Sequence, residues 1–286
     1  MSMNTWSTTL PSTTDSDESS FSLVIAKHQR PPRAGALTAA LVFGWRGLLK
    51  IKHMPEELMH VVAIPIVFTV MFTYLFGGAL SSSTGSYLQF ILPGTLVMAV
   101  LLVTMYSGTG LNADISKGVF DRFRSLPIWQ PSPIIGAIIG DVGRYLVSTL
   151  IVLALGFAIG FRAGGGIAAV IAAVALILFF AFSLSWVWTT LGLVMRTPDA
   201  VMTIATVVVF PLTLASNVFA DPATMPGWLQ AFVKVNPVSH LVTVTRDLML
   251  DGSASGSELA WVLVWSFVLI AVFAPLTMSL YRRQSR

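Results

Sequence analysis

The chain has 286 residues, of which 55% are hydrophobic and 10% charged, and its mean hydropathy is +0.79. Because a soluble domain carries about 25% charged residues, this composition indicates an integral membrane protein. The net charge of +4 does not indicate a nucleic-acid partner, since most of the 17 Lys and Arg residues flank apolar segments. The absence of cysteine excludes disulfides, thiolate metal sites and cysteine nucleophiles.

The first elements along the chain are polar and amphipathic. Residues 1–33 are rich in Ser and Thr at their start and lack an apolar core, so we expect a disordered cytoplasmic tail. Residues 34–54 are predicted to form an interfacial helix on the inner leaflet, with a partly buried cytoplasmic helix as the alternative. Its apolar stripe includes Trp45, while Arg46 and Lys50 face elsewhere.

Six apolar segments follow within a membrane domain of residues 55–281. A helix needs about 20 apolar residues to cross about 30 Å of hydrocarbon, and each segment approaches or exceeds that length. The third is the least clear, and its helix is expected to begin near 132–135. The predicted spans are 58–76, 87–111, 133–161, 167–193, 200–219 and 259–280.

Basic residues set the expected orientation. With the N-terminus inside, thirteen Lys and Arg residues are cytoplasmic and three are external. This asymmetry predicts a multi-pass protein of the bacterial cytoplasmic membrane with both termini inside, residues 282–286 forming a short internal tail. Residues 226–250, between the last two spans, are too short to cross and are predicted to form two half-helices at the outer face.

A charged block between the second and third spans is the strongest functional signal. Residues 114–126 are predicted to form one amphipathic cytoplasmic helix. Its polar face carries Asp114, Lys117, Asp121 and Arg124, and its apolar face carries Ile115, Val119, Phe123 and Leu126. Such a block indicates a docking element for a soluble partner.

The remaining charged residues do not predict chemistry on this chain. There is no nucleotide-binding glycine loop, and the four histidines are too scattered to hold a metal, so no cofactor is expected. Asp141 and Arg144 lie three residues apart, and we interpret them as a structural ion pair in preference to an ion relay. The outer-face charges, which include His240, Arg246 and Glu258, are interpreted as solvated rather than as an acid/base site.

Three blocks together resemble the ABC-2 permease family, most closely the daunorubicin-resistance-type subunits. They are Lys117-Gly118-Val119-Phe120-Asp121-Arg122-Phe123-Arg124-Ser125-Leu126-Pro127-Ile128 with the Asp141/Arg144 pair, the segment 226–246, and the helix around Trp45-Arg46. The resemblance covers roughly residues 35–284. It implies an all-α, six-span half-transporter with the fold of a type-2 ABC exporter.

The resemblance also implies partners and roles. Two copies of a separate ATP-binding subunit would carry ATP and Mg, and a second permease, the same chain or a homologue, would complete the path through the membrane lipid. Residues 114–126 would be the coupling helix, contacting the ATPase through Asp114, Lys117, Gly118, Phe120, Asp121, Arg122, Phe123, Arg124 and Leu126. Residues 34–54 would be the connecting helix, and the outer half-helices would form a gate.

An amphiphilic substrate, such as a drug, antibiotic, lipid or glycolipid, would pass along soft and polar side chains. The candidates are Phe68, Phe72, Met98, Met105, Tyr106, Pro211, Thr213, Asn217 and Phe219. Plain helix packing is the alternative role for each of them. An ion-coupled transporter or channel, and a membrane-embedded transferase or hydrolase that uses His240 or Asp247, are the alternative functions.

Overall fold

The computed structural model describes residues 38, 42, 44, 63, 66–75, 77, 84–118 and 132–284, all within the unit Gly35–Arg286. Several predictions lie outside these residues: the N-terminal tail, the connecting helix with Trp45, Arg46 and Lys50, and the coupling residues from Phe120 to Leu126. Across the described ranges the regular elements are helices, and no strand occurs.

The helices alternate in direction through the bundle. A first apolar helical segment, Ile66–Leu75, precedes α4. The later elements are α4 (Thr84–Ser116), α6 (Ser132–Ile159), α7 (Gly166–Val194), α8 (Pro198–Leu214), the 3₁₀ turn η1 (Pro222–Thr224), α9 (Gly227–Val235), α10 (Pro237–Asp251) and α11 (Gly256–Gln284). Within the described residues, α4, α6, α7 and α11 are long and apolar enough to cross a membrane.

Local sequence explains where several helices begin and end. Thr197 and Asn236 cap α8 and α10 by accepting hydrogen bonds from the backbone N–H of Ala200 and Val238, and a proline follows each cap. Proline at the first helical position lacks only an N–H that would have no partner in the helix. Gly252 ends α10 with a left-handed backbone (φ 77°), which glycine adopts without steric cost.

Helix α4 lies at the centre of the bundle, where it packs against α6, α7, α8 and α10. In its most apolar stretch 83% of the residues are buried within the chain, against 11% for α11. An apolar helix that is buried inside the protein contacts other helices, whereas an exposed apolar helix is available to lipid. The fold therefore separates a central α4 from a peripheral α11.

Two glycines bring α4 and α7 into backbone contact. A Cβ atom on Gly108 would lie 2.2 Å from the carbonyl oxygen of Trp188, and one on Gly192 would lie 2.5 Å from that of Gly108. Polar side chains bridge the same seam: Asn112 Nδ2 donates to the carbonyl of Gly192 (2.8 Å), and Trp188 Nε1 donates to Thr104 Oγ1 (2.9 Å). Small residues and interhelical hydrogen bonds stabilise helix contacts where lipid removes the hydrophobic driving force.

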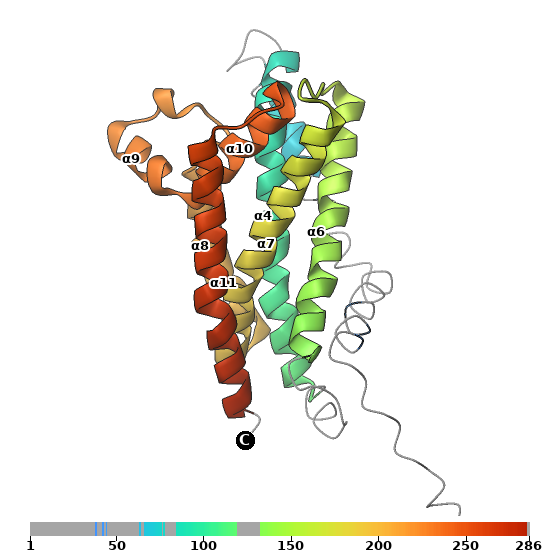
Figure 1. Ribbon diagram of the computed structural model, residues 1–286, viewed down its shortest axis with the longest axis vertical. Coiled ribbons are helices and arrows are strands. Elements are labelled where there is room, and N and C mark those ends of the chain that lie inside the picture. The colour runs from blue at the N-terminus through green and yellow to red at the C-terminus, as the bar shows by residue number, and fades with distance from the viewer. Residues whose placement is uncertain are drawn as a thin grey trace, which may run out of the picture. The chain divides into compact units, whose positions relative to one another are not determined.

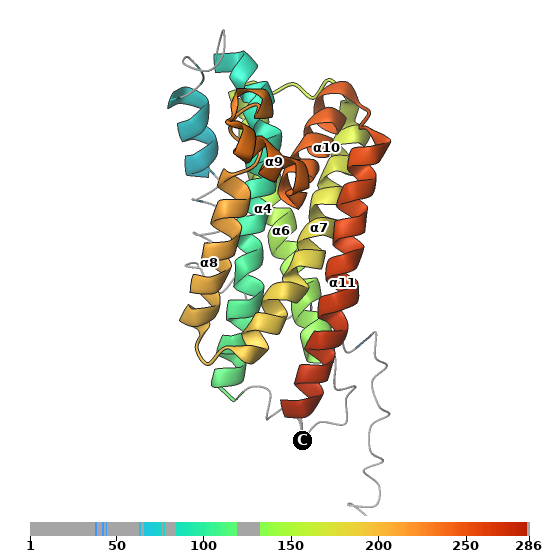
Figure 2. The same cartoon turned by 90° about the vertical axis from the view of Figure 1, so that its left-hand side faces the viewer.

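Different elements lie at the two ends of the bundle. Figures 1 and 2 show α9 and α10 at the end opposite the C-terminus of α11. The last turn of α4 and the first turn of α6 lie at the C-terminal end. We call residues 215–251, which follow α8 and include α9 and α10, the cap. The segment that joins α4 to α6 therefore begins and ends on the side of the bundle opposite the cap.

The fifth helix ends earlier than predicted, and the third begins where it was expected. The fifth span was expected to continue to residue 219, but α8 ends at Leu214, and the cap begins there. The Ala215 N–H makes the last helical bond, to the Pro211 carbonyl, and the Asn236 side chain donates to the Leu212 and Ala215 carbonyls at this helix end. The third helix begins at Ser132, within the interval expected for it.

Candidate functional site

The end of α4 places the first residues of the expected coupling helix. Asp114 lies in the last turn of α4, and Lys117 and Gly118 form the turn that follows. The N–H groups of Lys117 and Gly118 donate to the carbonyls of Ala113 (3.1 Å) and Ile115 (2.9 Å), and Gly118 has a left-handed backbone (φ 67°). The first residues of the predicted coupling helix therefore belong to the end of α4, which closes at the αL conformation of Gly118, and its residues 119–126 lie outside the described part of the chain.

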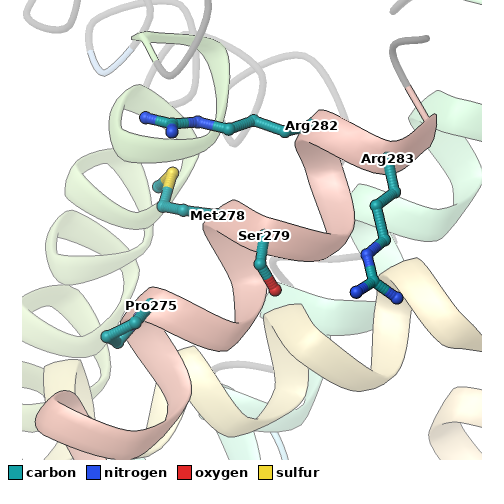
Figure 3. Close-up of a pocket in the computed structure, with 5 residues that line it drawn as sticks. All are labelled: Pro275, Met278, Ser279, Arg282 and Arg283. Carbon is teal, nitrogen blue, oxygen red and sulfur yellow. The ribbon is translucent and has the colours of Figure 1, made fainter.

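A hollow of about 450 Å³ lies beside the last turns of α11, at the same end of the bundle. Its described lining consists of Pro275, Met278, Ser279, Arg282 and Arg283, and the two guanidinium groups point in different directions from the helix (Figure 3). Arginines in the last turn of a helix complement its dipole. They also fit the anionic headgroups expected at the inner face of a membrane.

Asp141 and Arg144 form an ion pair on α6. The Asp141 side chain is buried, and the adjacent Tyr145 hydroxyl lies 2.5 Å from Ser107 Oγ on α4. A buried carboxylate is stable only when it is paired or hydrogen-bonded, and Arg144 supplies that partner. The Asp141–Arg144 ion pair within α6 therefore lies next to the hydrogen bond between Tyr145 and Ser107 that joins α6 to α4.

Three of the path candidates form an aromatic cluster. Phe68 stacks on Phe72 with ring centroids 5.6 Å apart, and Phe72 contacts Phe219 of the cap at 4.4 Å. The Phe219 carbonyl accepts a hydrogen bond from the Tyr87 hydroxyl of α4 at 3.2 Å. The structure thus brings the helix before α4, α4 itself and the cap together at one aromatic contact.

The other path candidates are dispersed. Met98 and Met105 on α4 are each 3% exposed and pack inside their own chain, while Tyr106 is half-buried. Thr213 is buried and donates to the Val209 carbonyl at 2.8 Å, whereas Pro211 is exposed on α8. Asn217 lies in the cap, after the end of α8. The candidates do not line one continuous surface within the described chain.

Arg246 joins the cap to α4. Its Nε donates to the Phe90 carbonyl at 3.0 Å, its Nη2 donates to the Asn217 carbonyl at 2.9 Å, and its guanidinium carbon lies 3.9 Å from the centre of the Phe90 ring. Burial lowers the pKa of Arg246 to about 10, against the opposing effect of the Asp247 and Asp221 carboxylates. The prediction of a solvated charge was wrong here, because α10 packs against α4 and turns Arg246 inward.

His240 is also buried, contrary to the same prediction. Its Nε2 lies 3.0 Å from the Lys234 carbonyl oxygen, and its Nδ1 contacts the Glu258 carboxylate. The Trp261 ring stacks on the imidazole with ring centroids 5.7 Å apart. A carbonyl accepts only, so Nε2–H donates to Lys234. The histidine therefore links α9, α10 and the start of α11.

The rest of the cap is held by Asn236. Its Oδ1 accepts from the Val238 N–H at 3.0 Å, while its Nδ2 donates to the carbonyls of Leu212 (2.7 Å) and Ala215 (3.2 Å). The sequence could predict the helix cap from an Asn before a proline. The second role, closing the end of α8, had no signal in the sequence because its partners lie 21 and 24 residues away.

Neither end offers a resident metal centre in the part of the chain that the structure describes. No group of three His, Cys, Asp or Glu side chains there has a geometry that could hold a metal ion. The described features at the two ends are the C-terminal turn of α4 on one side and, on the other, a cap that Arg246 attaches to α4.

Comparison with known proteins places this arrangement in a family. Residues 38–250 match the ABC-2 type transporter model. A daunorubicin resistance ABC transporter permease protein of Streptomyces coeruleorubidus, DrrB1, is 47% identical over 281 residues, which cover 97% of this chain and 99% of that protein.

More distant relatives belong to the same class. A doxorubicin resistance ABC transporter permease protein of Mycobacterium tuberculosis, DrrB, is 28% identical over 76% of this chain and 80% of its own length. The inner membrane transport permease YadH of Escherichia coli is 24% identical over 64% of this chain and 72% of its own length. Since the family model covers well over half of the chain, the protein belongs to the ABC-2 type transporter family.

Proposed function

We propose that this chain is the permease subunit of an ATP-driven exporter that moves an amphiphilic substrate out across the bacterial cytoplasmic membrane. The 47% identity to a daunorubicin resistance permease over nearly both full lengths is the observation that carries the proposal. The relatives' names favour a drug or antibiotic as substrate, while a lipid or glycolipid would have similar amphiphilic chemistry. ATP and Mg bind a separate ATPase subunit, two copies of which dock below the membrane.

Helix α4 is the element through which work is transmitted in this proposal. Its C-terminal end leads through Gly118 into the docking segment, residues 119–131, and its other half carries Phe90, the partner of Arg246. A helix of 33 residues is about 50 Å long, enough to connect the two sides of a bilayer. Closure of the ATPase moves the docked segment, α4 and α6 follow, and the cap opens or closes through Arg246.

A second permease, either the same chain or a homologue, completes the translocation path. The supporting observation is a pair of exposed apolar surfaces on the helices that flank the aromatic cluster. Ile66–Leu75 exposes Val67, Met71 and Tyr74, and α8 exposes Val207 and Phe210. The resemblance to ABC-2 permeases assigns these helices to the contact with the partner permease, so the cluster of Phe68, Phe72 and Phe219 would face the path.

Charge reversal in the docking segment tests the coupling step. The double variant Asp121→Lys, Arg124→Glu is expected to insert into the membrane normally but to lose substrate-stimulated ATPase activity and transport in vesicles with its ATPase subunit. The charge reversal Arg162→Glu, in the loop between α6 and α7, is the matched control and should retain both activities. Normal transport and ATPase stimulation in the double variant would contradict the docking role.

Single cysteines test the orientation, because the native chain has none. Ser83→Cys and Ser257→Cys are expected to react with an impermeant thiol reagent from outside intact cells, whereas Ser125→Cys should react only after the membrane is opened. Reaction of Ser125→Cys from the outside would refute the proposed topology and with it the docking of a cytoplasmic ATPase.

A further inference from the structure

The cap contains a cavity of about 400 Å³ that neither the coupling role nor the helix contacts explain. It lies between α9, α10, the start of α11 and the loop after α8, and its lining includes Asn217, Ser239, His240, Thr243, Glu258 and Trp261. This volume falls in the range of small-molecule sites, roughly 300–1,000 Å³. Lys234 and Trp261 are exposed, so the cavity reaches the surface of the described chain.

Two buried polar atoms in the wall lack partners. Asn217 Oδ1 and Ser239 Oγ neither donate nor accept a hydrogen bond within the described residues, although their residues are 5% and 3% exposed. The orientation of the Asn217 amide is fixed by Thr243, whose hydroxyl donates to the Ser239 carbonyl (3.0 Å) and so accepts from Asn217 Nδ2 (2.8 Å). Buried polar groups are normally satisfied, so these two atoms are free to bond a molecule that enters the cavity.

The chemistry of the wall indicates what the ligand carries. One Asn217 amide N–H, the Thr243 hydroxyl and the His240 Nε2–H are used within the protein, while the Asn217 carbonyl and the Glu258 carboxylate can accept from a ligand. The Ser239 hydroxyl can donate as well as accept, so a matching ligand carries groups that do both, as hydroxyls do. The Glu258 carboxylate is already paired with His240, so it offers little to an amine, which favours an uncharged ligand. The half-exposed indole of Trp261 adds an apolar ring face at the rim.

We propose that this cavity binds a compact, uncharged, hydroxyl-rich group, such as the sugar ring of a glycosylated amphiphile. Hydroxyls of the ligand donate to Asn217 Oδ1 and Glu258, and Ser239 Oγ pairs with a further hydroxyl. The role of the site rests on the proposed function: at the outer end of the path, it receives the polar head of the substrate as the substrate leaves. The binding itself is a property of the cap that is measured without transport.

A single cysteine in the cavity provides the measurement. Ala223 is exposed and lines the cavity, so Ala223→Cys in the otherwise cysteine-free chain reports its occupancy through the rate of reaction with a small thiol reagent. Methyl β-D-glucopyranoside at about ten times its dissociation constant is expected to slow the reaction about tenfold, since about one site in eleven is then free. Ser253→Cys, exposed but outside the lining, is the control and should react at an unchanged rate.

Two further variants identify the chemistry. Ser239→Ala removes an oxygen that has no hydrogen-bond partner among the described residues, so the fold is retained, and the glycoside should bind about three- to tenfold more weakly. Glu258→Gln keeps an acceptor without the charge, so glycoside protection should persist. Protection by methylammonium in place of the glycoside, or loss of protection in Glu258→Gln with Ser239→Ala unaffected, would refute an uncharged polyol site.

The outcome for the site and the outcome for the proposed function can be separated. If the glycoside gives no protection while the chain and its ATPase subunit still export a substrate from vesicles, the cavity proposal fails and the permease assignment stands. If the glycoside protects but no ATP-driven export occurs, the site stands and its role as an exit site fails.

Discussion

The contact between α4 and α7 allows a quantitative test with a control in the same helix turn. Gly108 and Gly110 are both in α4, two residues apart. A Cβ atom on Gly108 would lie 2.2 Å from the Trp188 carbonyl oxygen, whereas one on Gly110 would have no atom of the described residues within 4 Å. Gly108→Ala is therefore expected to destabilise the fold, and Gly110→Ala is expected to be neutral or stabilising.

The size of the effect follows from the separation that the methyl group requires. An ordinary contact to Cβ begins at 3.4 Å, so the two backbones must move apart by about 1 Å at Gly108. Overpacking of this kind costs about 1–3 kcal/mol. The same movement stretches the bonds from Asn112 to Gly192 and from Trp188 to Thr104, each worth about 1 kcal/mol. We expect a total loss of about 3–5 kcal/mol.

Thermal unfolding of the purified protein in detergent measures this loss. With about 2–4 °C per kcal/mol for a chain of this size, Gly108→Ala should lower the apparent Tm by about 10 °C. Alanine is favoured over glycine inside a helix by about 0.5–1 kcal/mol, so Gly110→Ala should match or exceed the native Tm. Equal Tm values for the two variants would show that the α4–α7 seam does not depend on backbone contact at Gly108.

Three further predictions concern the cap. A lysine at position 246 cannot reach the Phe90 and Asn217 carbonyls together, so Arg246→Lys should lower the free energy of unfolding by about 2 kcal/mol. The loss should appear as a lower Tm and as a faster reaction of the Ala223→Cys thiol in the same background. Asn236→Asp keeps the helix-capping oxygen but loses both donated bonds, so it should be less stable than the native chain. An Asn236→Asp variant as stable as the native chain would exclude a role for the donated bonds. Burial, and to a smaller extent the nearby Asp251 carboxylate, raises the pKa of Asp247, so its ionised form is disfavoured in the folded protein. The free energy of unfolding should therefore rise as the pH falls through the folded pKa towards the ordinary Asp value. The pH–Tm profile of Asp247→Asn should lack this rise.

Composition and periodicity predicted the helical membrane class and the approximate positions of the long helices. The reason is physical: about 20 apolar residues in sequence have no stable place except a membrane-spanning or buried helix. The caps of α8 and α10 could also be predicted from sequence, since Thr197-Pro198 and Asn236-Pro237 cap the helix starts through neighbouring residues.

The docking segment was predicted from charge and spacing, but the end of α4 at the turn before it was not. Helical periodicity continues from Asp114 through Arg124 without interruption. The left-handed backbone of Gly118 separates the two parts, and glycine tolerates both helical and left-handed conformations, so its residue type alone did not decide between them. Residues 119–126 of the predicted coupling helix lie outside the described residues and remain a prediction.

The cap shows where sequence patterns stopped being sufficient. His240 and Arg246 look like surface charges on a short amphipathic helix, yet both are held inside the cap. Their burial depends on Phe90, 156 residues from Arg246, and on Glu258, 18 residues from His240. No local periodicity contains those partners, and only the packing of α10 against α4 and α11 supplies them.

The amino-acid sequence determined that this protein is a helical membrane protein, and it predicted a charged segment on one side of the membrane and short helices on the other. The tertiary structure decided which helix is central and which of two neighbouring glycines is indispensable. Gly108 and Gly110 are equivalent in sequence, because both lie in the same apolar helix beside small polar residues. They differ in space because the backbone of α7 lies against only one of them.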